Sequence, residues 1–201
     1  MISALLDTNV ILNWLTISRA SEENKKKFKR EVASKYSNFE LLERIGKKEL
    51  AGDFRISNIS KAEFIRLICE KLCWDKMAQD GVSGYDFHYY YEKMEITEAD
   101  KYEIIRGIVQ FEAGFIDSKM IKYIRPRKLD AIWLTLLLSK YKLTPQDALI
   151  VTEGIMQGCK YMVTSDKRLI DATKKIGKIK IVHPQKFMEI IRSENNENPR
   201  H

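Results

Sequence analysis

Residues 144–166, TPQDALIVTEGIMQGCKYMVTSD, carry the clearest structural signal in this sequence. Thr144-Pro145 predicts the start of a helix, because proline is favoured at the first helical position, and we expect that helix to end near Gly158. The apolar run 161–164 then predicts a short strand, and Ser165-Asp166 leads into another helix. A strand set between two helices is typical of a parallel sheet covered by helices.

The same alternation continues on both sides of this stretch. Residues 2–6 predict a buried strand and 10–17 a helix, with a break at Asp7-Thr8-Asn9 between them. Residues 54–59 predict a second strand, with a helix starting at Ser60. Residues 179–182 predict a strand, with a final helix over 184–192. The fold class is therefore α/β with a central, mostly parallel sheet, and ligands of such sheets bind beyond the carboxyl ends of the strands.

The remaining segments read as helical additions to this sheet. Residues 21–50 predict one or two surface helices, and 75–93 a loop or loosely helical insertion. Thr97 is expected to cap a helix running to about 113, and a further helix is expected over 129–141. We predict one domain over 1–192 with helical insertions at about 18–53 and 75–130, followed by a polar, disordered tail over 193–201.

Composition points to a soluble protein with a polyanionic partner. The 201 residues carry 35 Lys and Arg against 28 Asp and Glu, a net charge of +7. That charge suits a nucleic acid, although ordinary solubilising charge is the alternative. We see no apolar run long enough to span a membrane and no secretory signal at the start. Three cysteines, an odd number, argue against a disulfide scaffold, so we expect a cytoplasmic protein without a membrane partner.

Four acids fall at the starts of predicted helices: Asp7, Glu63, Asp147 and Asp166. Two of them, Asp7 and Asp166, come directly after predicted strands and so lie at the edge where ligands bind. Hydrolysis of a phosphodiester needs an attacking water and stabilisation of negative charge. Mg²⁺ and Mn²⁺ supply both and prefer oxygen ligands, so carboxylates from separate elements suit such a site.

Each acid also has a structural alternative, and taken singly that alternative is the more frequent one. Asp7 and Asp166 could be N-caps of the helices that follow them. Ser60-Lys61-Ala62-Glu63 has the pattern of a capping box. An acid in the first turn of a helix, as at Asp147, also interacts favourably with the helix dipole. What favours a joint function is that all four are expected beside the same edge of the sheet.

These segments resemble the motifs of PIN domains. Leu5-Leu6-Asp7-Thr8-Asn9 resembles the opening motif, and Leu143-Thr144-Pro145-Gln146-Asp147-Ala148-Leu149-Ile150 the second acidic motif. Gly158-Cys159-Lys160-Tyr161-Met162-Val163-Thr164-Ser165-Asp166 is similar to the strand and acid that follow. Ile59-Ser60-Lys61-Ala62-Glu63 occupies the place of the internal glutamate. The resemblance covers roughly residues 1–15, 54–73 and 143–183.

The resemblance implies an α/β/α sandwich and a ribonuclease that depends on Mg²⁺ or Mn²⁺. The catalytic residues it implies are Asp7, Glu63, Asp147 and Asp166. Three of these, Asp7, Asp147 and Asp166, would bind the metal. Hydrogen-bonding support would come from Thr8, Asn9 and Ser165. The best-known small relatives are VapC-type toxins, so an antitoxin protein and a homodimer are the implied partners.

The sequence departs from the family pattern in two respects. Many relatives carry a further acid two or three residues beyond the last aspartate, where this chain has Arg168 and Leu169. The chain is also longer than compact toxins. Both departures keep open a second interpretation, a catalytically inactive PIN-like scaffold that binds RNA or protein.

Basic residues gather in two places. The cluster predicted to bind RNA consists of Lys119, Lys122, Arg125, Arg127 and Lys128. The other cluster consists of Lys25, Lys26, Lys27, Lys29 and Arg30, and for it a solvated helix face is the favoured interpretation.

Overall fold

The computed structural model describes residues 2–124 and 128–197. In this part of the chain the centre is one sheet of five parallel strands in the order β3-β2-β1-β4-β5. The strands are β1 (Ser3–Leu6), β2 (Asp53–Ile56), β3 (Ile121–Tyr123), β4 (Tyr161–Val163) and β5 (Lys180–Val182). The chain builds outward from β1 to β3, then crosses back and adds β4 and β5 on the other side of β1. The direction of winding therefore reverses between β1 and β4, and the carboxyl ends of these two strands form the switch point at which such sheets bind ligands.

Ten α-helices surround the sheet in the described part. They are α1 (Thr8–Ser18), α2 (Glu22–Glu31), α3 (Ala33–Gly46), α4 (Asn58–Asp80), α5 (Phe87–Lys93), α6 (Glu98–Phe111), α7 (Ala131–Ser139), α8 (Pro145–Met156), α9 (Lys167–Thr173) and α10 (Pro184–Glu197). A single-turn 3₁₀ helix, Gly84–Asp86, precedes α5, and a π-helix, Glu112–Ile116, follows α6.

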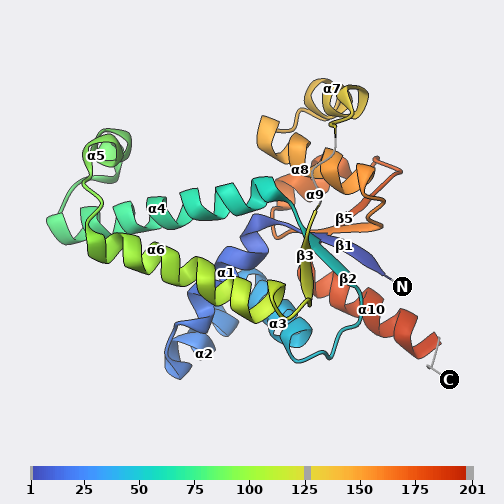
Figure 1. Cartoon of the computed structure of the whole chain (residues 1–201), viewed down its shortest axis with the longest axis horizontal. Coiled ribbons are helices and arrows are strands. Elements are labelled where there is room, and N and C mark those ends of the chain that lie inside the picture. Colours follow the sequence, from blue (N-terminus) through green and yellow to red (C-terminus); the bar gives the residue numbers. More distant parts are fainter. Residues whose placement is uncertain (1, 125–127, 198–201) are drawn as a thin grey trace.

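Helices cover both faces of the sheet, as predicted, in an arrangement compatible with three layers (Figure 1). Side chains alternate between the faces along a strand. Ala4 and Leu6 point into a core shared with α1, α3 and α10, whereas Leu5 points into a second core shared with α8 and α9. Because β1 is buried on both faces, residues 2–6 read as a nearly continuous apolar run.

Helix α8 approaches the sheet closely at Gly154. A Cβ placed there would lie 3.0 Å from side-chain atoms of both Leu5 and Ile179. The glycine therefore allows the last turns of α8 to pack closely against β1.

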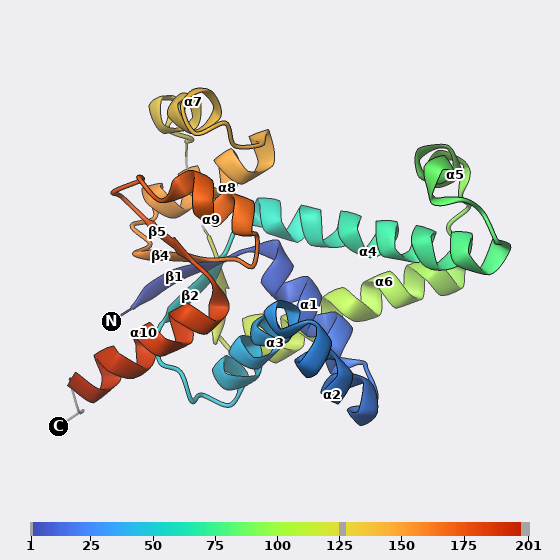
Figure 2. The same ribbon diagram turned by 180° about the vertical axis from the view of Figure 1, so that it is seen from behind.

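An arm of two antiparallel helices projects from the body of the protein. Helices α4 and α6 lie side by side along it, and α5 sits at the tip (Figures 1 and 2). Of the two alternatives predicted for 75–93, the helical one is confirmed over most of the segment, since α4 continues to Asp80 and α5 begins at Phe87. Aromatic stacking orders this tip: the rings of Trp74 and Phe87 are 4.4 Å apart, and Phe87 also stacks on Tyr91.

One strand and two helix ends differ from the predictions. Strand β3 was missed inside the expected insertion at 75–130, because three residues are too few to show a period. Helix α4 starts at Asn58 with Ser57 as its cap, two residues before the expected start. Helix α10 continues past 192 to Glu197, into the segment expected to be disordered. No helix in the described ranges is both long and apolar enough to cross a bilayer.

Candidate active site

Asp7 lies at the switch point between the ends of β1 and β4. It directly follows β1 and is the N-cap of α1, and only 5% of its surface is exposed. Its Oδ1 accepts a hydrogen bond from the backbone N–H of Thr8 at 2.8 Å. Its Oδ2 accepts from the Thr164 hydroxyl at 2.7 Å and from the Asn9 amide at 3.2 Å. The capping role is therefore real, but it occupies only one of the two carboxylate oxygens.

Glu63 reaches the same region from the second turn of α4. The Thr8 hydroxyl donates to Glu63 Oε2 at 2.5 Å, which joins α4 to the start of α1. The capping-box interpretation of Ser60 and Glu63 is wrong, because α4 begins at Asn58 and Ser57 caps it. Glu63 therefore does not cap α4, and its charge acts on Asp7 instead.

Asp147 enters from the first turn of α8. The Thr144 hydroxyl donates to Asp147 Oδ2 at 2.6 Å and also accepts from the Asp147 backbone N–H at 3.2 Å. Its side chain is 23% exposed, and Arg168 Nη2 lies 3.8 Å from Oδ2. The cap at Thr144-Pro145 therefore holds this acid in a partly exposed position at the start of α8.

The carboxylates of Asp7, Glu63 and Asp147 are called the acidic cluster below, because the charges of Glu63 and Asp147 act on Asp7 and that of Asp147 acts on Glu63. Burial, with smaller contributions from the charges of Glu63 and Asp147, raises the pKa of Asp7 from 3.8 to about 6, against the lowering effect of the hydrogen bonds from Thr164 and Thr8. Burial and the charge of Asp147 also raise the pKa of Glu63. Like charges gathered in a partly buried site oppose ionisation, and a cation placed between them would relieve that repulsion.

Asp166 follows β4 closely and caps α9. Its Oδ1 accepts from the backbone N–H groups of Arg168 and Leu169 at 2.8 and 3.1 Å. Its own N–H donates to the Thr164 hydroxyl at 3.0 Å. For this acid the described contacts are those of the capping alternative, and Thr164 provides its link to Asp7.

Thr164 is the residue that sequence reasoning missed. It is fully buried, and its hydroxyl connects Asp7 Oδ2 to the backbone of Asp166. Support was expected from Ser165, which is only half-buried. The available signal was the polar end of the apolar run 161–164, because a hydroxyl at the buried end of a strand needs a partner. The other two supporting residues, Thr8 and Asn9, do bond to the acids.

The donor chemistry of the site fits Mg²⁺ or Mn²⁺, since its side chains offer carboxylate and hydroxyl oxygens. The side chains as they stand do not yet form a set of ligands. Across residues 2–124 and 128–197, no three His, Cys, Asp or Glu side chains are grouped closely enough to hold a metal ion. The Thr8 hydroxyl bonds one oxygen of Glu63, and the Thr144 hydroxyl bonds one oxygen of Asp147.

The predicted RNA-binding cluster lies partly outside the described residues, which omit Arg125 and Arg127. Of the others, Lys119 is exposed in a turn with φ of 59° before β3, and Lys128 is also exposed. Lys122 lies on β3 with its Nζ 3.3 Å from Asp53 Oδ1. Lys119 and Lys122 therefore lie at the β3 edge of the sheet, and Lys122 already has an acidic partner.

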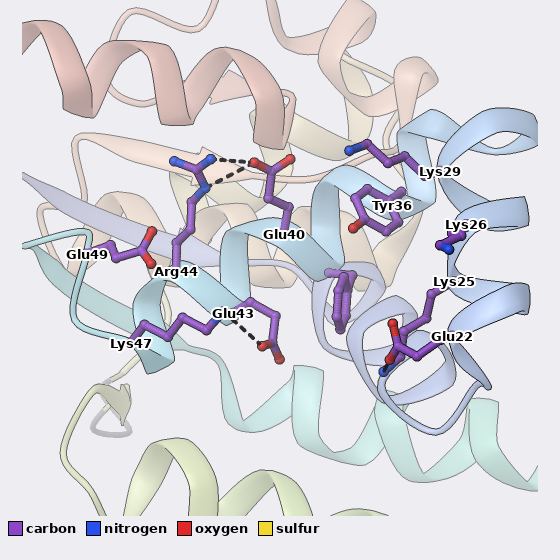
Figure 3. Close-up of a pocket in the computed structure, with 11 residues that line it drawn as sticks. Glu22, Lys25, Lys26, Lys29, Tyr36, Glu40, Glu43, Arg44, Lys47 and Glu49 are labelled. Atoms are coloured by element: carbon purple, nitrogen blue, oxygen red, sulfur yellow. Dashed lines mark hydrogen bonds and ion pairs between the residues drawn. The ribbon is translucent and has the colours of Figure 1, made fainter.

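The N-terminal basic cluster lines a separate cleft of about 590 Å³ between α2 and α3 (Figure 3). Lys25, Lys26 and Lys29 reach it from α2, and Lys29 Nζ lies 5.7 Å from the centre of the Tyr36 ring. The opposite wall carries acids that pair within their own helix, as Glu40 does with Arg44. Because cations and anions alternate here, the solvated-face interpretation remains the favoured one.

No family model matches this chain, and neither does any curated protein. The acidic cluster and its contacts therefore carry the functional argument.

Proposed function

We propose that this chain is an endoribonuclease dependent on Mg²⁺ or Mn²⁺, with a PIN-like site formed by Asp7, Glu63, Asp147 and Asp166. The observation that supports it best is that Glu63, from α4, and Asp147, from the first turn of α8, act electrostatically on Asp7 at the end of β1, beside the switch point of the sheet. Helix capping accounts for Asp166 but not for this arrangement, because burial and the neighbouring charges raise the pKa of both Asp7 and Glu63. Carboxylates brought together at such a cost are typical of functional sites.

The role proposed for each acid follows from its burial and its hydrogen bonds. A bound divalent cation would activate water and stabilise negative charge on the phosphate. Asp7 and Asp147 are the proposed ligands, since Asp7 is fixed by three hydrogen bonds and Asp147 is partly exposed at the start of α8. Glu63 is 18% exposed and has a side chain long enough to orient a water, while Asp166 would complete the ligand set. The net charge of +7 is compatible with RNA as the substrate.

Cleavage of labelled single-stranded RNA in the presence of Mn²⁺ tests the proposal. Asp7→Asn and Asp147→Asn are expected to abolish cleavage, because each removes a charge without changing side-chain size. Asp117→Asn, which changes an exposed acid outside the site, is the matched control. Cleavage that survives both site substitutions would overturn the proposal.

A non-catalytic scaffold is the second candidate. Two observations favour it. The side chains of the described residues form no ready-made group of metal ligands. Arg168, whose side chain lies near Asp147, stands at a position where many PIN domains carry an acid. Titration calorimetry with Mn²⁺ separates the two candidates. Absence of Mn²⁺ binding together with intact RNA binding would favour the scaffold.

The cellular setting is proposed on the resemblance to PIN toxins alone. We propose a cytoplasmic protein whose activity an antitoxin restrains, and which forms a homodimer. Light scattering measures the oligomeric state. Inhibition of RNA cleavage by the product of an adjacent small gene would support the antitoxin, and lack of inhibition would contradict it.

A further inference from the structure

Two arginines stand at the rim of the acidic cluster, each beside a different acid. Arg66 comes from α4, and its Nη2 lies 4.0 Å from Glu63 Oε1. Arg168 comes from α9, and its Nη2 lies 3.8 Å from Asp147 Oδ2. The start of α4 lies beside α9 in both views of the molecule (Figures 1 and 2). The acids beside the two arginines belong to the same cluster, because the charge of Asp147 acts on Glu63.

Neither arginine is committed to the acid beside it. Both distances exceed those of a charge-assisted hydrogen bond, which is about 2.7–2.9 Å. The Arg168 side chain is 74% exposed, and that of Arg66 is 48% exposed. Arg66 also pairs closely with Glu70 on the next turn of α4, which fixes its position without covering it. Their remaining N–H groups are open to a ligand from solvent.

The positive charge of the two arginines suits an anionic substrate. Carboxylates repel an RNA phosphate, so positive charge beside them, in addition to that of a bound cation, would favour the approach of the substrate. Guanidinium suits this role, because its planar fork of N–H donors matches the oxygens of a phosphate.

We propose that Arg66 and Arg168 form a phosphate clamp that holds the RNA backbone across the acidic cluster. The clamp rests on the proposed function, because it positions the same substrate for the same acids. Contacts to phosphate set the register of a nucleic acid but read no sequence. The clamp thus strengthens binding of every single-stranded RNA to a similar extent.

Binding of fluorescein-labelled single-stranded RNA, measured by fluorescence anisotropy in the Asp7→Asn background, tests the clamp without cleavage. Arg66→Ala and Arg168→Ala are each expected to weaken binding about tenfold. The slope of log affinity against log salt should fall by about 0.7 for each phosphate that the variant no longer neutralises. Matched controls are Arg106→Ala, which removes an exposed arginine of α6, and Lys174→Ala, which removes an exposed cation next to α9.

The outcomes separate the clamp from the nuclease proposal. Weaker binding and a smaller salt slope in both arginine variants, equal for RNAs of different sequence and absent in the controls, would support the clamp. Affinity no weaker than in the controls would overturn it, even if the wild-type protein cleaves RNA. Weaker binding of one RNA sequence alone would also overturn it, because that result indicates base recognition. Absence of cleavage by the wild-type protein would count against the nuclease and leave the binding result to decide the clamp.

Discussion

Replacement of Asp7 by asparagine should abolish the proposed RNA cleavage and yet raise the free energy of unfolding at neutral pH. The carboxylate is almost fully buried, and its pKa is raised from 3.8 to about 6, mainly by burial. Between these two pH values the folded state holds a proton that the unfolded state releases. The free energy of unfolding of the wild-type protein therefore falls as pH rises through this window.

The size of the effect follows from the shift in pKa. A difference between 3.8 and about 6 corresponds to about 3 kcal/mol once the pH lies above both values. Asparagine carries no charge and so escapes this cost. It also weakens the hydrogen bonds from Thr8 and Thr164, which offsets roughly 1–2 kcal/mol of the gain. The net gain at pH 8 is therefore expected to be about 1–2 kcal/mol.

Urea unfolding of both proteins at a series of pH values, with EDTA present, measures this effect. The advantage of Asp7→Asn over the wild type should grow by about 3 kcal/mol from below pH 4 to above pH 7. Asp117→Asn, at an exposed position, should show no comparable growth. A difference that stays constant across this range would refute the assignment of Asp7 as a buried carboxylate with a raised pKa.

Three further substitutions probe the same region. Thr164→Val removes the hydroxyl bonded to Asp7, so it should lower the free energy of unfolding by about 1–3 kcal/mol in the same urea assay. Because that bond lowers the pKa of Asp7, the loss of stability with pH should also extend to higher pH. An unchanged unfolding transition would contradict the hydrogen bond. Gly154→Ala should cost about 1–3 kcal/mol in thermal or urea unfolding, because its Cβ meets side chains at 3.0 Å, whereas Gly177→Ala faces open space and should be neutral. Glu63→Gln should suppress RNA cleavage with little loss of stability, and full activity would remove this residue from the site.

The sequence alone determined the alternation of strands and helices and the order of the acids along it. Residues 2–6 predict β1 because burial on both faces demands a run of apolar side chains, and Thr144-Pro145 predicts the start of α8 because capping is local chemistry. Such features depend on neighbours within a few residues. For the same reason Thr97 predicted the start of α6, where its side chain and that of Asp100 form a capping box.

Tertiary structure alone decided which acids meet. Asp7 and Glu63 are brought together by the pairing of β1 with β2, and no local pattern records that pairing. In the sequence Glu63 had an equally good role in a capping box, and only the position of Ser57 at the start of α4 excluded it. Thr164 likewise gains its role from the pairing of β4 with β1. Contacts between residues far apart in the chain depend on strand order and packing, and that is why only the folded chain brings the acidic cluster together.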